Sequence, residues 1–348
     1  MPPKKDDTAG LRQLKADLKA GKPGPCYLFC GEEAYLRDFY LGRLKERLLP
    51  AGMEEFNLHT LDGKGFTLRA LEEAIDCLPM MSERTLILVT DLDLFKAAGD
   101  IREGVVALLS ELPDYVCLVF LYDLIEYKPD ARTKLAAALK DHATVVKFAR
   151  QDQGDLIDWV KRRFKAVDKE IDSELARYLI FLCGDLMNTL IGEIGKIGAY
   201  AGNHRITKAD IDAVAAPQLD AVVFQMTDAL GAGNFDKAAS VLADLLHMQE
   251  APIKLLAVLG KQLRQLYSAR LALEARKGAG AVAELWGMRS SYPAEKLMSA
   301  ARRFDLDWCR FAVRRCGEVD LAMKSTGADG EALLVGLLME LAAAPAKR

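Results

Sequence analysis

A glycine at the end of a short apolar run is the first place where the sequence suggests chemistry. The segment "CYLFCGEEAYLRD", residues 26 to 38, predicts a strand, a turn at Gly31 and the start of a helix. A phosphate-binding loop here would read GxxxxGK[ST]: glycines admit phosphate to backbone N–H groups, lysine binds the β and γ groups, and the hydroxyl binds Mg²⁺. Leu36, Arg37 and Asp38 stand where the second glycine, the lysine and the hydroxyl would be. Only the first glycine of the pattern remains.

These replacements oppose phosphate binding. Leu36 places a bulky side chain where backbone must touch phosphate, and Asp38 places a carboxylate beside a polyanion. Two like charges about 4 Å apart repel by about 1 kcal/mol in water and by about 4 kcal/mol at an effective dielectric constant near 20. Glu32 and Glu33 add further negative charge to the turn. We interpret the segment as a degenerate, non-functional phosphate loop and expect no nucleotide cofactor.

Other candidate catalytic residues form no recognisable motif. Asp91 and Asp93 end the apolar run "LILVTDLD" but do not form the adjacent Asp-Glu pair of an NTPase, so a strand end turned by aspartates is the simpler interpretation. The four histidines are far apart, and no HExxH, GxSxG or GxGxxG motif occurs in a suitable context. The seven cysteines are scattered, mostly within apolar segments, and predict buried free thiols rather than a zinc site. We expect no metal and no catalytic residue.

The elements that would position these residues differ between the two halves of the chain. Up to about residue 148, short apolar runs alternate with helical patterns: strands are expected at 26–30, 56–63, 85–91, 115–122 and 143–148, and helices at 34–48, 68–77, 101–112 and 132–142. Unbroken Val/Ile/Leu runs separated by helices are typical of a parallel sheet covered on both faces. This half predicts an α/β layout of the nucleotide-binding type.

From about residue 152 the strand patterns stop and every segment has a helical pattern. A first helical cluster ends near "APQLD", where Pro217 favours a linker. In the long segment from Pro252 to Lys277, leucines at 255, 259, 263 and 266 fall on one face, and lysines at 254 and 261 fall on another. The fold class expected is therefore α/β plus all-α, with three domains at 1–148, 149–215 and 216–348.

Bulk properties are compatible with this division. A chain of 348 residues exceeds what one hydrophobic core usually supports. Its net charge of −3 argues against whole-protein electrostatic binding to DNA, although a local basic face remains possible. The N-terminal "MPPKKDDTAG" has no apolar stretch of signal-peptide length, and no uncharged stretch approaches about 20 residues. We expect a cytoplasmic protein with no membrane partner.

One apolar segment stands out for a different kind of function. In "RALEEAIDCLPMMSERTLILV", Leu71, Ile75 and Leu78 have the spacing of one helix face, and Pro79 stops the helix. Met80 and Met81 follow, before the next strand. Proline beside flexible, polarisable side chains predicts a protruding apolar tip that binds in a partner's pocket. The alternative is that both methionines pack under the sheet.

At this point the residues match a known family. The segments "YLFCGEEAYLRD", "LPMMSERTLILV", "VFQMTDALGAGNFDKAASVLADLLHMQEAPIKLLAVLGKQLRQLYSARL" and "EVDLAMKSTG", in this order, resemble the delta subunit of the bacterial DNA polymerase III clamp loader. The resemblance covers nearly the whole chain. It implies a RecA-like AAA+ domain with a degenerate phosphate loop, a small helical lid and a C-terminal helical collar for oligomerisation. It also implies that the chain does not hydrolyse ATP.

The family resemblance implies a function and a set of partners. Delta subunits bind the ring-shaped sliding clamp (the beta ring) and help open it for loading onto primed DNA, within a hetero-pentamer that also contains delta-prime and the ATPase gamma/tau subunits. The clamp-binding residues are carried over to Leu78, Pro79, Met80 and Met81. Relatives often have aromatic or leucine side chains at this tip, and two methionines are a departure. The chain itself would be an accessory subunit of the polymerase holoenzyme, with no catalysis of its own.

Contact with primer-template DNA is a secondary expectation. Basic clusters that would contact phosphates in the assembled loader are Lys161, Arg162, Arg163, Arg302, Arg303, Arg314 and Arg315. The alternative is that they form solvated helix faces. Two rival identities are an active AAA+ ATPase with an unusual phosphate loop, and another subunit of the same loader. The first would need an intact phosphate-loop lysine and hydroxyl; a delta-prime subunit would usually have a zinc-binding cysteine set and a Ser-Arg-Cys motif. The sequence has none of these.

Overall fold

The computed structural model describes residues 9–344 and divides the chain into two compact units. The sheet unit contains the described residues up to Gln151 together with Leu186–Asn188, and the helical unit contains Asp152–Asp185 and the described residues from Thr189 onward. Most of the N-terminal segment discussed above lies outside the described residues. The finer division of the helical unit at residues 215 and 216 stays a prediction.

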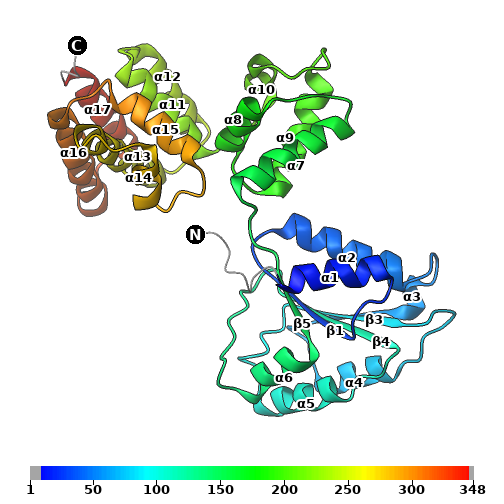
Figure 1. Ribbon diagram of the computed structural model, residues 1–348. Coiled ribbons are helices and arrows are strands. Elements are labelled where there is room, and N and C mark those ends of the chain that lie inside the picture. Colours follow the sequence, from blue (N-terminus) through cyan, green and yellow to red (C-terminus); the bar gives the residue numbers. More distant parts are fainter. Residues whose placement is uncertain (1–8, 345–348) are drawn as a thin grey trace. The chain divides into compact units, whose positions relative to one another are not determined.

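The sheet unit is built on a five-stranded parallel sheet with the strand order β2-β3-β4-β1-β5 (Figure 1). The strands are β1 (Cys26–Cys30), β2 (Leu58–Asp62), β3 (Thr85–Thr90), β4 (Val116–Leu121) and β5 (Thr144–Lys147). On the interior strand β1, Leu28 pairs with Phe120 of β4 and Val145 of β5. Every residue of β1 and β4 is buried, which explains why their apolar runs are unbroken.

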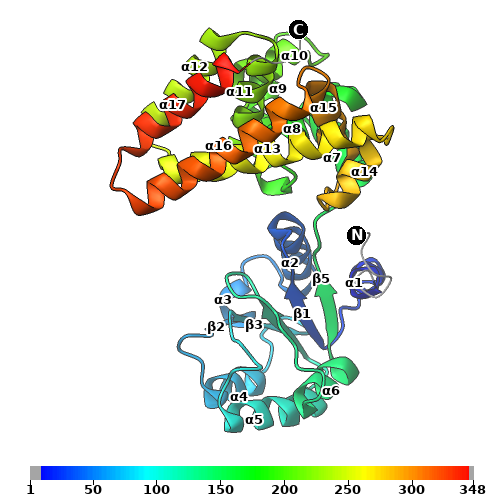
Figure 2. The same ribbon diagram turned by 90° about the vertical axis from the view of Figure 1, so that its left-hand side faces the viewer.

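Helices cover both faces of this sheet (Figures 1 and 2). They are α1 (Ala9–Ala20), α2 (Ala34–Leu48), α3 (Glu54–Asn57), α4 (Leu68–Asp76), α5 (Gly99–Ser110) and α6 (Lys134–His142). Leu14 of α1 and Leu44 of α2 belong to the core on one face, and Leu71 of α4 and Leu135 of α6 belong to the core on the other. All four predicted helices exist, whereas α1 and α3 were not predicted. The predicted strand at 56–63 is wrong at its start, because residues 56 and 57 belong to α3.

In the helical unit, every regular element of the described residues is a helix, and its single isolated bridge joins Glu170 to Arg205. The helices are α7 (Gln153–Ala166), α8 (Ser173–Cys183), α9 (Met187–Tyr200), α10 (Lys208–Val214), α11 (Leu219–Gly231), α12 (Phe235–His247), α13 (Pro252–Glu274), α14 (Ala279–Leu285), α15 (Ser291–Ala301), α16 (Leu306–Ser325) and α17 (Gly330–Ala343); the first two residues of α9 belong to the sheet unit. Polar residues cap many of them. Asp172, for example, accepts a hydrogen bond from the backbone of Leu175 at the start of α8. Pro252 is accommodated because it stands in the first turn of α13.

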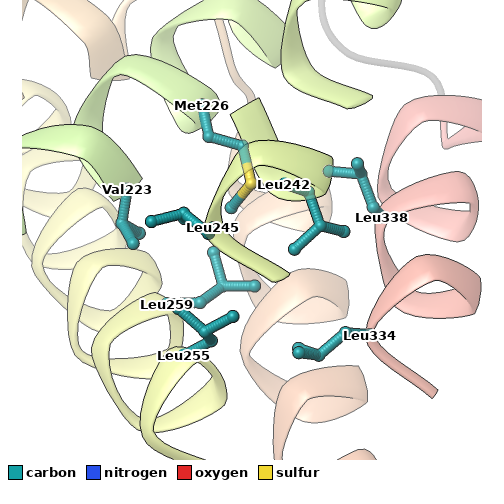
Figure 3. A pocket seen from close by; sticks show the side chains of 8 residues that line it. All are labelled: Val223, Met226, Leu242, Leu245, Leu255, Leu259, Leu334 and Leu338. Carbon is teal, nitrogen blue, oxygen red and sulfur yellow. The ribbon is translucent and has the colours of Figure 1, made fainter. Parts of the chain in front are cut away.

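The core of α11 to α17 is continuous and almost fully packed. The four leucines predicted to share one face of α13 are all buried, and Lys254 and Lys261 are exposed, as expected. A cavity of about 10 Å³, enough for about one water molecule, lies between α11, α12, α13 and α17 (Figure 3). Its lining is entirely apolar: Val223, Met226, Leu242, Leu245, Leu255, Leu259, Leu334 and Leu338. We interpret it as a packing defect rather than a ligand site.

The fold class predicted from the sequence, α/β plus all-α, is confirmed. None of the described helices is, on its own, long and apolar enough to cross a bilayer. Ser173–Cys183 and Met187–Tyr200 reach that length and composition only as a pair bent by 118°.

Candidate functional site

The segment Leu78–Met81, which we call the tip, projects from the sheet unit between α4 and β3. Helix α4 ends at Asp76, one residue before the predicted end at 77, and Cys77 is already extended. Leu71 and Ile75 are buried, but Leu78 lies beyond the helix and is 73% exposed, so its predicted place on the same helix face is wrong. Met80 and Met81 are 51% and 79% exposed. The alternative that both methionines pack under the sheet is therefore wrong.

The tip is held in place by one buried side chain, Asn57 at the end of α3. The Asn57 side chain accepts a hydrogen bond from the backbone N–H of Met80 at 2.8 Å and donates one to the Met80 carbonyl at 2.9 Å. It also donates to the carbonyl of Met53 at 3.1 Å, and it is completely buried. Because a buried amide is costly unless it is hydrogen-bonded, these contacts fix the register between α3 and the tip.

The backbone of the tip forms a tight turn. Met81 has a φ of 52°, in the left-handed region that residues other than glycine rarely adopt. The next residue, Ser82, donates from its hydroxyl to the carbonyl of Leu48 at 3.0 Å, which fastens the end of the tip to α2. The tip is therefore a turn fastened on both sides of Met81, and it presents its side chains outward.

Two residues near the tip, Asn57 and Phe56, were not predicted from the sequence. Asn57 looked like part of a strand, and no pattern links it to a segment 23 residues further along the chain. Phe56 precedes it and is half-exposed. The short acidic start of α3, Glu54 and Glu55, was the only available sign that a helix begins there.

The turn at Gly31 lies at the opposite edge of the sheet, where the parallel strands end. Gly31 has a φ of 115°, and a Cβ atom there would lie 2.4 Å from the carbonyl oxygen of Phe148. The backbone N–H of Glu33 donates to this same carbonyl at 3.0 Å. The buried Glu33 carboxylate accepts a hydrogen bond from the N–H of Met187 at 3.4 Å. Backbone groups that would face a phosphate are thus partly engaged within the chain.

The side chains at the remaining phosphate-loop positions are also occupied. Arg37 is buried; its guanidinium donates to the carbonyl of Tyr122 at 3.3 Å and forms an ion pair with Asp123. Leu36 packs against the core beneath α1 and α2. Asp38 is largely exposed and lies 3.6 Å from the Arg37 guanidinium. The cation at the lysine position therefore points to the end of β4 and pairs with a carboxylate of the chain.

The two aspartates after β3 have structural partners. Asp91 adopts a φ of 55°, and its carboxylate accepts backbone hydrogen bonds from Asp123, Leu124 and Ile125 at 2.8, 2.9 and 3.3 Å. Such a row of N–H groups is an anion-binding nest, and here the chain's own carboxylate fills it. Asp93 pairs with Lys96 at 3.0 Å. Among the described residues no cluster of His, Cys, Asp or Glu is arranged to hold a metal ion.

The basic residues expected to contact DNA are spread over α7, α15, α16 and their flanks, and most have partners within the chain. Arg303 pairs with Asp228 at 2.7 Å, Arg314 lies 3.8 Å from Glu318, and Arg315 binds Glu340 at 2.5 and 2.8 Å. Lys161 donates to Ser173, and Arg163 lies over the ring of Trp159. Within the part of the chain that the structure describes, Arg162 and Arg302 are exposed and have no ion pair. These two remain the strongest candidates of the set.

Comparison with protein families agrees with this geometry. Residues 27–149 match the family described as DNA polymerase III, delta subunit, and residues 220–341 match the DNA polymerase III delta subunit, C-terminal domain. The chain belongs to the DNA polymerase III delta subunit family. The matched ranges contain the tip, the turn at Gly31 and the core of α11 to α17.

Individual relatives of this delta-family chain cover most of its length. It is 25% identical over 330 residues to DNA polymerase III subunit delta of Bacillus subtilis, covering 93% of this chain and 94% of that one. It is 22% identical over 282 residues to a probable DNA polymerase III subunit delta of Aquifex aeolicus, covering 78% of each. The solved structure of the Bacillus subtilis DNA clamp loader delta protein matches with a TM-score of 0.56 and 22% identity, over 95% of this chain and 99% of that one. The last comparison supports the same fold.

Proposed function

We propose that this chain is the clamp-binding subunit of a bacterial clamp loader. It binds the sliding clamp through Leu78, Pro79, Met80 and Met81 and helps open the ring for loading onto primed DNA. The observation that carries the proposal is an exposed apolar tip, fixed by a buried amide, in a delta-family chain. An apolar turn that the fold holds in an exposed position is suited to insertion into a pocket on a partner.

The insertion of the tip into a pocket would contribute directly to the stability of a complex. Burying an apolar side chain contributes roughly 1.5 to 3 kcal/mol, so the three exposed tip side chains provide about 4.5 to 9 kcal/mol before the cost of association. If the tip fits the open form of the ring better than the closed form, part of this energy favours opening. In that role the chain acts by differential binding and needs no chemistry of its own.

We further propose that the chain neither binds nor hydrolyses ATP, and that its partners are gamma/tau and delta-prime in a hetero-pentamer, together with primer-template DNA. The contacts of Arg37, Asp91 and Glu33 within the chain support this proposal, because each uses a group that nucleotide or Mg²⁺ would need. Titration of the purified chain with ATP and Mg²⁺ tests it. Binding in the micromolar range would favour the rival identity as an active ATPase.

The clamp-binding proposal is tested by the double substitution Met80→Asp and Met81→Asp. Burying two carboxylates in an apolar pocket is unfavourable, so the dissociation constant for the clamp should rise by at least about 100-fold, which corresponds to about 2.8 kcal/mol. Leu124→Asp is a matched control, because Leu124 is 85% exposed in the same unit but lies at the other edge of the sheet. A folded double variant that binds the clamp as tightly as the wild type would refute the proposal.

A further inference from the structure

The apolar groups of the tip include two adjacent thioethers. Met80 and Met81 are both exposed, whereas Met187 and Met226 are each 2% exposed. Peroxides oxidise methionine thioethers to sulfoxides, and a solvent-exposed thioether is open to this reaction. A leucine or phenylalanine at the same positions would have a similar apolar surface without this reactivity.

We propose that Met80 and Met81 form an oxidation site at which a peroxide turns clamp binding off. The inference rests on the proposed function, because it concerns the affinity of the same tip. In the reaction the methionine sulfur attacks one peroxide oxygen and the O–O bond breaks. The sulfur is oxidised by two electrons and gains the first oxygen. The second oxygen leaves as hydroxide, takes the proton from the oxygen now on sulfur, and becomes water, which leaves the S=O group. The product is methionine sulfoxide, which a sulfoxide reductase returns to the thioether.

The structure explains why this change would act on binding rather than on folding. Both side chains project into solvent, and Asn57 holds Met80 through backbone groups that do not include the sulfur. The sulfoxide oxygen is therefore hydrated in the free chain at no cost to the fold. On binding, however, it must lose water inside an apolar pocket. We expect oxidation to raise the dissociation constant for the clamp about tenfold or more.

The experiment oxidises the chain alone and leaves the clamp untreated. Purified full-length chain is treated with hydrogen peroxide, the excess is removed with catalase, and dithiothreitol reverses any reversible cysteine oxidation, since Cys77 is exposed beside the tip. Mass spectrometry of peptides confirms sulfoxide at positions 80 and 81. Affinity for the sliding clamp of the same organism is then measured before oxidation, after oxidation, and after treatment with methionine sulfoxide reductases of both epimer specificities.

Two double variants separate the tip from other methionines. Met80→Leu with Met81→Leu should bind the clamp and keep its affinity after peroxide. Met248→Leu with Met339→Leu removes two exposed methionines outside the tip and should lose affinity like the wild type. Reductase treatment should restore binding of the wild type.

The possible results distinguish the two proposals. An untreated chain that does not bind the clamp would refute the proposed function, and the oxidation site with it. Unchanged affinity with sulfoxide present at both positions would overturn the oxidation site alone. Equal loss of affinity in the Met80→Leu, Met81→Leu variant would also overturn it, because the sensitive group would then lie elsewhere.

Discussion

Replacing Asn57 with alanine tests whether a side chain outside the tip controls what the tip can bind. The substitution removes the donor and the acceptor that pair with the backbone of Met80 at 2.9 and 2.8 Å. A typical hydrogen bond contributes about 0.5 to 1.5 kcal/mol net, so loss of these two weakens the held conformation by about 1 to 3 kcal/mol. We therefore expect a loosened tip and not an unfolded protein.

The affinity change follows from the population of the held conformation. When the binding-competent conformation is only fractionally populated, the apparent dissociation constant rises in inverse proportion to that fraction. A free-energy change of about 1 to 3 kcal/mol alters an equilibrium constant by about 5- to 150-fold. The dissociation constant for the clamp should therefore rise by no more than this factor. The measurement is the dissociation constant of the Asn57→Ala chain for the sliding clamp, with hydrogen exchange of the Met80 and Ser82 amides as the local readout.

Tyr27→Phe provides a control for general loss of stability. The Tyr27 hydroxyl accepts from the N–H of Gly24 at 2.6 Å and donates to Asp17 at 2.7 Å, in the same sheet unit, and neither hydrogen bond involves the tip. This variant also loses two hydrogen bonds, yet it should bind the clamp like the wild type. The reasoning fails if Asn57→Ala shows rapid exchange at Met80 and still binds the clamp with unchanged affinity, or if both variants lose affinity equally.

Three further outcomes are expected. In the native chain, maleimide should add to Cys77 alone, because the other six thiols are buried and burial raises the pKa of Cys117 to about 12; mass spectrometry would count the adducts. Leu259→Ala should enlarge the small cavity of the helical unit and lower the free energy of unfolding by about 2 to 5 kcal/mol, measured with urea. Hydrogen bonding to Arg315 lowers the pKa of Glu340, so this carboxylate stabilises the fold above the ordinary glutamate pKa and stops doing so as pH falls through the lowered value. The Tm difference between wild type and Glu340→Gln should shrink over that acidic range.

The sheet was predictable because its signal is local and strong. The run "VCLVFL" is buried over its whole length and "TLILVT" up to its last residue, and the helices between them follow from apolar spacing. The helix after the turn begins and ends where the pattern predicted, at Ala34 and Leu48. Such elements depend on the residues within them, so the sequence of each segment is sufficient.

The candidate site was predictable only in its residue types. The tip was found because a proline follows a helix and precedes two methionines, and proline acts locally. The end of the helix before Leu78 was not predicted, because helical spacing indicates a face without showing where the helix stops. The role of Asn57 could not be predicted from the sequence, because it depends on hydrogen bonds to a distant segment. Long-range hydrogen bonds between loops have no periodicity that a sequence pattern could reveal.

Different contacts stabilise the segments at the carboxyl ends and at the amino ends of the parallel strands. The difference indicates how exposure of the tip would be controlled. At the carboxyl edge, Arg37 and Asp91 tie β3, β4 and α2 together through an ion pair and a filled nest. Breaking these contacts would expose buried charge and unpaired N–H groups, so this edge is expected to stay rigid. At the amino edge, the tip depends mainly on Asn57 and Ser82. Since the edge where nucleotide would bind is fixed by the chain's own groups, we expect ATP-dependent exposure or covering of the tip to come from partner subunits.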